Sequence, residues 1–396
     1  MPRCRACRKI GVDDERPLHR KAAHLVYALA ILVLAVIGGG ACAEDARALF
    51  EAVLAAPTDI DANLRYARAV ERRGDGRQAL MAFERVLSVD PANSEARAGI
   101  ARLAGGGGGT PRSRTDIIAG VGIQYESNPR LLDAEFGREE DFAALVSLRI
   151  DDVREIGERR WRTRLTGQLR AYGRFTDGTL GYAGADSGPL FPIDGVGEIR
   201  PLIGIEHAQL SDGPLFSAAY LGAELVSPGL APLRAIDLIA SYADFSDDFP
   251  GRDGFLVRLR PQFGWTGVLT RDDRLGIEPE LTYNAATGED HRYRYWSAGT
   301  ALTYLLPVAD DALGFARIYG GPEFGVEHRQ YAGHDPGATE DRRDTRYTPG
   351  LRLIGVGFLD QDVTVVLRYY IERNRSNEAD KEFTNHVAGV VVYRRF

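Results

Sequence analysis

The sequence has few cysteines and no long apolar run. Its three cysteines stand at positions 4, 7 and 42. Its longest apolar run, Leu25–Ile37, is shorter than the ~20 residues that a membrane-spanning helix needs, so we expect no helical membrane protein. A membrane β-barrel stays open, because its strands alternate between apolar and polar residues and are only half hydrophobic on average.

The sequence also lacks a basic excess and the motifs of common enzymes. Its 49 basic and 56 acidic residues give a formal charge of −7, whereas nucleic-acid binders usually carry basic surfaces, so no nucleic-acid partner is expected. It contains no Gly-x-Ser-x-Gly, no His-Glu-x-x-His and no phosphate-binding glycine loop. We therefore predict no enzyme, no catalytic residue and no cofactor.

Two groups of residues resemble metal ligands. Cys4 and Cys7 form a single CxxC, which is a weak signal without a second pair. His328 and His334 lie in or near a segment that also holds three acidic residues, and histidine with carboxylate suits several metals. Those acidic residues are Asp335, Glu340 and Asp341. We favour a solvated loop there, and predict no metal site.

The first 43 residues have the pattern of a targeting segment. Basic residues, among them Arg20 and Lys21, precede the apolar run, and Ala41–Ala43 then offers small residues for cleavage. We expect residues 1–43 to be a signal peptide. Its removal takes away all three cysteines, which suits an exported chain without disulfides.

Residues 44–104 read as short amphipathic helices that form a periplasmic domain. Helices are expected over Ala46–Leu54, from Asp59 or Asp61 to Arg73, over Arg77–Leu87, and from a Ser94 cap to Leu103. Ile60–Asn93 has the 34-residue length of a tetratricopeptide repeat. The residues expected to pack and end its helices are Ala67, Ala79, Phe83 and Pro91. A generic helical hairpin is the alternative. Residues 105–114, which begin with five glycines, are expected to form a linker.

Residues 115–396 show apolar and polar residues in alternation again and again. In Arg160–Phe175 arginines fill most of one face for sixteen residues, a pattern that only an extended strand produces. Thirteen such segments are present, each long enough for the ~9–11 residues of a tilted transmembrane strand. Bacterial barrels have even strand numbers, so we expect about 14 strands, with the missing one within Thr176–Arg200. The predicted fold is an all-β transmembrane antiparallel β-barrel after a small α-helical domain.

The connections and the last residue fit this barrel. Short turns are expected at Glu155–Glu158 and Thr270–Arg274, facing the periplasm. Long polar loops are expected at the opposite end over Ser127–Glu140, Thr176–Gly195 and Tyr331–Thr345. A terminal aromatic residue, Phe396, resembles the closure signal that outer-membrane barrels share.

Arginines recur on the polar face of the strands, which we assign to the lumen. The predicted lumen-facing residues are Arg160, Arg162, Arg164, Arg170, Arg174, Arg258, Arg260, Arg352, Arg368, Glu278 and Glu280. One interpretation is a lumen that attracts anions such as phosphate or acidic polysaccharide. The other is a balanced interior, in which acidic residues pair with arginines across strands. The balancing residues would be Glu278, Glu280, Glu372 and Asp237, and we favour this second interpretation.

The layout resembles the surface lipoprotein assembly modifiers, the Slam proteins. The residues that carry the resemblance are the stretch Gly120–Pro129, with the sequence GVGIQYESNP, and the closing Tyr393–Phe396. The resemblance implies that the barrel helps lipoproteins or secreted proteins across the outer membrane without enzymatic chemistry. It also implies a seam between the first and last strands, Thr115–Tyr125 and Glu382–Phe396.

Two other functions stay open at this stage: an exopolysaccharide-export porin with a repeat domain, and a general or anion-preferring porin. In every case we expect a monomer in the outer membrane with its N-terminal domain in the periplasm. The expected partners are outer-membrane lipid or lipopolysaccharide, the barrel assembly machinery and a client lipoprotein or secreted protein.

Overall fold

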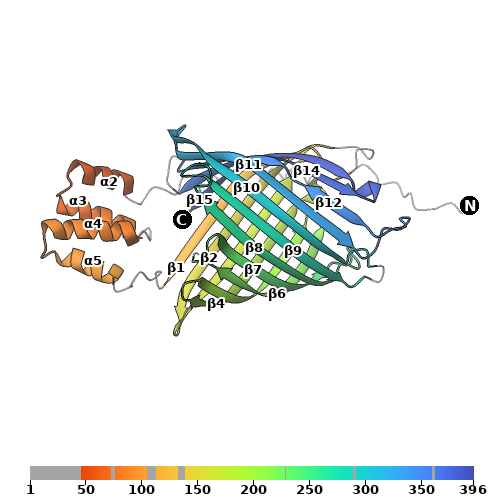
Figure 1. The fold of residues 1–396 in the computed structure, drawn as a ribbon, viewed down its shortest axis with the longest axis horizontal. Coiled ribbons are helices and arrows are strands. Elements are labelled where there is room, and N and C mark those ends of the chain that lie inside the picture. The colour runs from red at the N-terminus through yellow and green to blue at the C-terminus, as the bar shows by residue number, and fades with distance from the viewer. Residues whose placement is uncertain are drawn as a thin grey trace, which may run out of the picture.

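The computed structural model describes residues 46–72, 76–104, 113–132, 139–227, 229–288, 291–358 and 362–396. The predicted signal peptide and the five glycines of the linker lie outside these residues. Figure 1 shows a group of helices and a barrel of strands inclined to the barrel axis. None of the described helices has both the length and the apolar character to cross a bilayer.

The helical unit consists of α2 (Ala46–Ala55), α3 (Ile60–Arg72), α4 (Gly76–Val89) and α5 (Ser94–Ala104), close to the predicted ranges. Asp59 caps α3, because its Oδ1 accepts the N–H of Ala62 at 3.0 Å. The predicted cap of α5 was wrong by one residue. Asn93 fills this place, with its Oδ1 accepting the N–H of Ala96 at 3.0 Å.

The helices bury one apolar core, to which the predicted packing residues contribute. Ala67, Ala79 and Phe83 have no exposed surface, whereas Pro91 lies exposed in the turn after α4. A Cβ on Gly99 of α5 would lie 2.6–2.7 Å from ring carbons of Phe83. The aromatic ring of α4 therefore packs directly on the backbone of α5.

Replacing Gly99 by valine is expected to lower the unfolding free energy of the helical unit by about 2 kcal/mol, because overpacking a full core costs ~1–3 kcal/mol. Thermal melting of the full chain, followed by circular dichroism at the helix band, measures this loss. Ala98→Ser, at an exposed position of the same helix, is the control and is expected to stay within about 0.5 kcal/mol. Equal melting of the two variants would contradict the packing.

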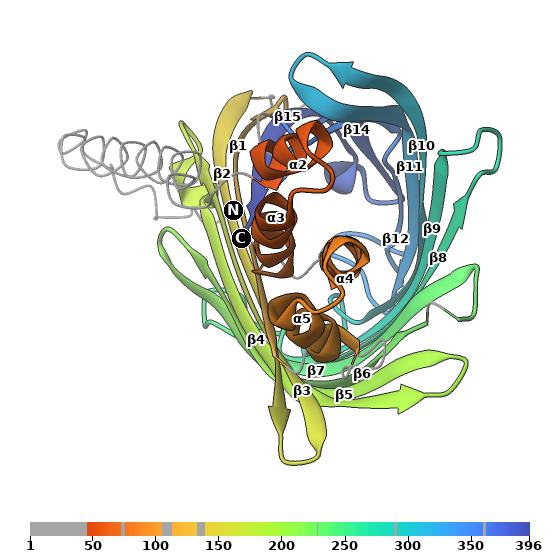
Figure 2. The ribbon, with the colours of Figure 1, turned by 90° about the vertical axis from the view of Figure 1, so that its left-hand side faces the viewer.

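The strands form one closed antiparallel sheet (Figure 2). Their bounds are β1 (Arg114–Glu126), β2 (Asp141–Ile156), β3 (Arg159–Tyr172), β4 (Leu180–Ile193), β5 (Gly197–Leu210), β6 (Gly213–Val226), β7 (Leu233–Phe245), β8 (Gly254–Thr266), β9 (Arg274–Ala286), β10 (Tyr295–Ala312), β11 (Phe315–Tyr331), β12 (Arg343–Tyr347), β13 (Gly350–Val356), β14 (Val363–Ser376) and β15 (Phe383–Arg395). Strands that follow one another in sequence pair, except that β12 and β13 both pair with β11 and β14, and β15 pairs with β1 to close the ring.

The barrel has fourteen strands, as predicted, because β12 and β13 are two parts of one strand. Both parts pair with β11 on one side and with β14 on the other. The fourteenth strand is β4, inside the range where it was expected. The prediction of a long loop over Thr176–Gly195 is therefore wrong. The predicted strand to Phe175 is also too long, since β3 ends at Tyr172.

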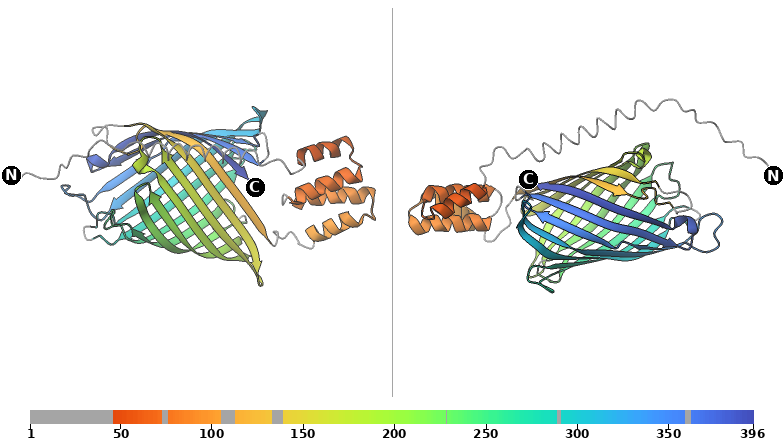
Figure 3. Two further views of the ribbon diagram at one scale, coloured as in Figure 1. Left: turned by 180° about the vertical axis from the view of Figure 1, so that it is seen from behind. Right: turned by 90° about the horizontal axis from the view of Figure 1, so that it is seen from above.

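The barrel has two different ends, which Figure 3 shows from behind and from above. At the end where β1 begins and β15 stops, which we call the terminal end, connections such as residues 157–158 are short. At the opposite end, the loop end, residues 127–140 and 332–342 form the longer connections. The short and long connections at residues 155–158 and 127–140 therefore lie where they were predicted.

Apolar side chains cover the outer wall of the barrel. Ile203 and Ile205 of β5 are 71% and 65% exposed, and Leu221 of β6 is 64% exposed. Among the described residues the compact apolar core belongs to the helical unit alone. The barrel is thus inverted relative to a water-soluble protein, with apolar residues outside and charged residues inside.

Candidate functional site

A cavity of about 780 Å³ lies inside the barrel. Its lining includes successive inward positions of β7, from Ala235 near the start of that strand to Phe245 at its last residue. The cavity therefore runs along the strand from near the terminal end to the loop end. A passage through the barrel requires a cavity that extends along the strands in this way.

Positive side chains outnumber negative ones in the lining of this cavity. The lining arginines are Arg149, Arg164, Arg200, Arg252, Arg258, Arg260, Arg329 and Arg342, and the lining acidic residues are Asp186, Glu206, Glu224 and Asp237. The lining is therefore net positive by count, although three of its arginines pair with carboxylates beside it: Arg149 with Asp151, Arg329 with Glu327 and Arg342 with Asp344. Low-dielectric walls focus such a field and concentrate mobile anions inside.

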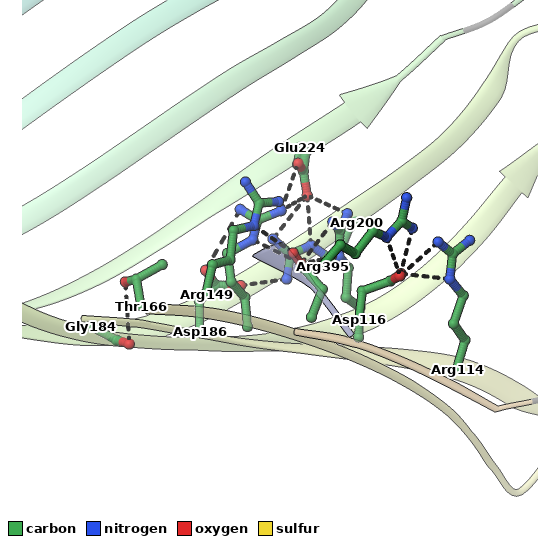
Figure 4. A network of polar contacts seen from close by, with 12 residues as sticks. Arg114, Asp116, Arg149, Thr166, Gly184, Asp186, Arg200, Glu224 and Arg395 are labelled. Atoms are coloured by element: carbon green, nitrogen blue, oxygen red, sulfur yellow. Dashed lines mark hydrogen bonds and ion pairs between the residues drawn. The ribbon is translucent and has the colours of Figure 1, made fainter. Parts of the chain in front are cut away.

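A network of ion pairs braces β2 to β6 on the terminal side of the lumen (Figure 4). Glu224 of β6 accepts from Arg200 of β5 at 2.9 Å and from Arg164 of β3 at 3.2 Å. Arg200 also bonds Asp186 of β4, and its side chain is only 1% exposed. Arg164 on β3 and Glu224 on β6 belong to strands that are three places apart in the sheet, so their side chains reach each other across the curved interior of the barrel. The network holds this wall of the lumen in one shape.

Asp151 of β2 extends the network at its other side. Its carboxylate lies 2.8 Å from Arg162, 3.1 Å from Arg164 and 2.5 Å from Arg149. Arg162 and Arg164 are shared between several carboxylates, so their charge is largely compensated. The network is thus a structural brace rather than a site with free charge.

Two arginines of the cavity have no acidic partner in the part of the chain that the structure describes. They are Arg258, about halfway along the inward face of β8, and Arg252 in the connection before that strand. The guanidinium of Arg252 lies 4.8 Å from the ring centroid of Tyr293, a cation–π contact that leaves its charge uncompensated. Neighbouring Arg260, in contrast, pairs with Asp237 at 2.9 Å.

Tyrosine rings line the cavity beside the arginines near the loop end. The rings of Tyr295 and Tyr331 lie 5.4 Å apart. Arg329 stacks over Tyr295, and Arg342 stacks over Tyr331, each at 4.5 Å from the ring centroid. Stacked guanidinium groups keep a fixed orientation toward the cavity, because the ring supports one face of each.

The loop-end rim is tied by one lysine. Lys381 lies 2.6 Å from Asp335, joining the connection after β11 to the one after β14. Burial alone would raise the pKa of Asp335, but the hydrogen bond from Lys381 and the nearby charges of Arg342 and Arg292 hold this pKa below its usual value. The rim therefore stays paired at neutral pH.

Most of the arginines predicted to face the lumen lie on inward positions. Arg160 pairs with Glu198 at 2.6 Å, Arg170 lies 3.6 Å from Glu126, and Arg352 pairs with Glu323 at 2.7 Å. Arg368 bonds the same Glu323. Arg162, Arg164, Arg258 and Arg260 also lie on inward positions.

The structure differs from the predicted lumen at Arg174, Glu278 and Glu280. Arg174 lies exposed beyond the end of β3, so its assignment to the lumen wall is wrong. Glu278 and Glu280 share the inward face of β9, but no ion pair joins either to an arginine among the described residues. The carboxylates that do pair, which the sequence reasoning missed, include Asp151, Asp186, Glu224 and Glu323.

The histidines considered as metal ligands lie apart. His328 stands on β11, where its Nδ1 lies 3.0 Å from Thr345 Oγ1. His334 lies in the following connection, 3.7 Å from Asp341. Within the described ranges no group of three or more histidine, cysteine, aspartate or glutamate side chains is placed to hold a metal ion.

The closing seam between β1 and β15 is formed by residues of the GVGIQYESNP stretch. The ladder runs from Ile118 opposite Arg395 to Glu126 opposite Val387, nine pairs against thirteen between β1 and β2. A Cβ on Gly120 would lie 2.7 Å from ring carbons of Tyr393, so this ring lies across the glycine. At the terminal end, the N–H of Phe396 donates to Ile117 O at 2.9 Å.

Buried side chains hold the loop end of this seam. Asn385 of β15 donates to Glu126 Oε2 at 3.0 Å and accepts the N–H of Asn128 at 2.9 Å. The N–H of His386 donates to Ser127 Oγ at 2.8 Å, and Tyr172 of β3 donates to Glu126 Oε1 at 2.7 Å. The stretch Glu126–Asn128 therefore joins the two ends of the sheet.

Asn385→Ala is expected to destabilise the seam by about 2 kcal/mol, because it leaves two buried polar partners unsatisfied. Hydrogen exchange of the amides of Ile118–Glu126 in the intact barrel measures this loss as faster exchange. Ser211→Ala, in the exposed two-residue turn after β5, is the control. Unchanged exchange at β1 would show that Asn385 does not support the seam.

Comparison with known proteins identifies no family. No protein-family model matches the chain, and no curated protein matches it. Among solved structures, similarity extends to a BenF-like porin from Pseudomonas fluorescens (9% identity, TM-score 0.35, covering 72% of this chain and 99% of that one). It extends also to a loop-deletion mutant of OmpT of Vibrio cholerae (7%, TM-score 0.38, 72% and 100%) and to a bacterial polysaccharide outer membrane secretin (10%, TM-score 0.37, 70% and 98%). At these values any functional conclusion has to come from the residues of this chain.

Proposed function

We propose that the chain is an outer-membrane channel that passes anionic solutes. The observation that carries this proposal is the positive cavity along β7 and β8, with Arg252 and Arg258 free of acidic partners among the described residues. The exposed apolar wall of the barrel suits a lipid environment, and the predicted signal peptide suits export. Of the balancing residues that the sequence favoured, Asp237 pairs with Arg260 at 2.9 Å and Glu372 with Arg346 at 3.2 Å, so the proposal rests on the arginines of the cavity that lack such partners.

The mechanism is selection by charge without a chemical step. The field of the arginines raises the anion concentration in the cavity, and the uncompensated guanidinium groups offer successive weak sites. Arg252 near the loop end and Arg258 farther inside would form such a pair of sites. The paired arginines around Glu224 keep the wall in place while solutes pass.

The helical unit would lie on the periplasmic side in this proposal. It precedes β1, which starts at the terminal end, so the chain connects it to that end. The close packing of Ala67, Ala79 and Phe83 supports a tetratricopeptide-like arrangement, which commonly serves to bind other proteins. A periplasmic partner that delivers or modifies the solute would dock there.

Ion conductance in planar bilayers tests the channel. A salt gradient across the bilayer is expected to give a reversal potential on the anion side for the full chain. A version without residues 44–109 is expected to keep the same preference, because the cavity residues all belong to the barrel. A barrel that inserts but does not conduct, or that prefers cations, would overturn the proposal.

Translocation of proteins in the manner of the Slam proteins is the second candidate. The observation that favours it is the position of the GVGIQYESNP stretch at the β1–β15 seam, where the ladder has only nine pairs. A role of this kind would require the two strands to part. Cysteines at Ile123 and Val390, which stand opposite each other, would lock the seam in a mature chain that has no other cysteine. Locking would stop protein export but leave ion conductance unchanged.

A further inference from the structure

Three arginines gather on the outer wall at the loop end of β12 and β14. Arg346 of β12 and Glu372 of β14 face the lumen, where they pair at 3.2 Å. Side chains alternate along a strand, so Arg343, Arg373 and Arg375 face outward. We call these three residues the outward arginine patch. All three are exposed.

The patch holds positive charge that the described protein does not neutralise. Arg343 pairs with Glu340 at 2.8 Å. Arg373 and Arg375 make no side-chain hydrogen bond or ion pair with any residue of the described ranges. The nearby Glu382 is exposed, and its Oε1 accepts the N–H of Ser376 at 3.4 Å. Two guanidinium groups therefore stay available to a ligand.

The position of the patch on the barrel wall is unusual within this molecule. At the loop end of the other described strands, the outward positions carry apolar, aromatic, small or uncharged polar residues, the histidines His207, His328 and His386, or in β7 an aspartate. Directly below the patch on the same strand lie the outward-facing Ile371 and Tyr369, the latter 43% exposed. The charged patch thus borders the apolar wall.

Polar neighbours complete a surface of hydrogen-bond donors. Thr345 of β12 stands opposite Arg375 on one side and opposite His328 on the other. Tyr347 stands opposite Arg373. One row of the wall therefore offers an imidazole, a hydroxyl and a guanidinium group, and the next offers a phenol and a guanidinium group.

We propose that the outward arginine patch binds the phosphate groups of a lipid in the membrane leaflet at the loop end. This rests on the proposed function, since the barrel must lie in a bilayer. Guanidinium groups bind phosphate through two parallel hydrogen bonds, and Arg373 and Arg375 are free to do so. The acyl chains of the same lipid would cover Ile371 and Tyr369. A soluble anion lacks this second contact, so a phosphorylated lipid fits the whole surface.

Binding of bis-phosphorylated lipid A to the purified full chain in detergent tests the proposal, with native mass spectrometry as the readout. Arg373→Gln combined with Arg375→Gln is expected to weaken binding about tenfold or more, because each arginine contributes a charge-assisted bond to phosphate. Lipid A stripped of its phosphates is expected to bind weakly to both proteins. Arg154→Gln with Arg159→Gln, two exposed outward arginines near the terminal end, is the control and is expected to bind like the parent.

Equal affinity for the two lipids, or equal affinity of the patch variant and the parent, would overturn the proposal. The same preparations are tested for insertion into bilayers and for conductance. A chain that neither inserts nor conducts contradicts the proposed function itself. A chain that inserts and conducts, but whose lipid affinity does not depend on Arg373 and Arg375, contradicts the lipid site alone.

Discussion

Replacing both Arg252 and Arg258 by glutamate is expected to abolish the anion preference of the barrel or reverse it. These two arginines have no acidic partner among the described residues, so each substitution changes the net charge of the cavity by two units. The eight arginines and four carboxylates of the lining become six of each. The reversal potential in a tenfold salt gradient measures the change, which low ionic strength enlarges because screening is weaker there.

The control for this experiment carries the same charge change elsewhere. Arg154 and Arg159 are exposed on the outer side of the hairpin between β2 and β3, and their joint replacement by glutamate is expected to leave the reversal potential unchanged. If the doubly substituted cavity keeps the anion preference of the parent, then these two arginines do not set the selectivity. In that case the rim of the barrel becomes the next place to examine.

Arg200→Ala is expected to lower the unfolding free energy of the barrel by about 3 kcal/mol, because breaking a buried ion pair leaves uncompensated charge behind. Asp186 and Glu224 would then share only Arg162 and Arg164. Urea unfolding in detergent or lipid, followed by tryptophan fluorescence, measures the loss.

Arg154→Ala removes the exposed pair with Asp152 and serves as the control, with an expected change within about 0.5 kcal/mol. Similar unfolding midpoints for the two variants would mean that the network of Glu224 does not brace the wall. Conductance of Arg200→Ala adds a second readout. A loosened wall is expected to make the current noisier even where the barrel remains folded.

The alternation of apolar and polar residues was enough to predict most of the barrel, because each strand has one face toward lipid-like surroundings and one toward the lumen. It failed at β4, whose sequence LGYAGADSGPLFPI is rich in small residues. Glycine, alanine and serine hardly differ in their preference for the two faces, so this strand had no visible pattern. The count of fourteen came from the requirement for an even number.

The inward arginines were predictable from alternation within a single strand, but their partners were not. The pairing of Arg164 with Glu224 depends on the curvature that brings β3 and β6 together, which no local pattern reports. Asp186 could not be found because its strand was missed. Arg174 was misassigned because polar and apolar residues continue to alternate past the point where β3 ends.

The interruption between β12 and β13 indicates where the strands of the barrel would separate most easily. Thr348 still exchanges two hydrogen bonds with Gly325, and Pro349 O accepts the N–H of Ile371 at 2.9 Å, but Pro349 has no N–H to donate. A closed ring of strands has no edge from which to unravel, so strand separation would begin where one strand of the ring is interrupted, as it is between β12 and β13. The short β12 on its loop side would then come away first, as a local fluctuation that leaves the rest of the cylinder intact.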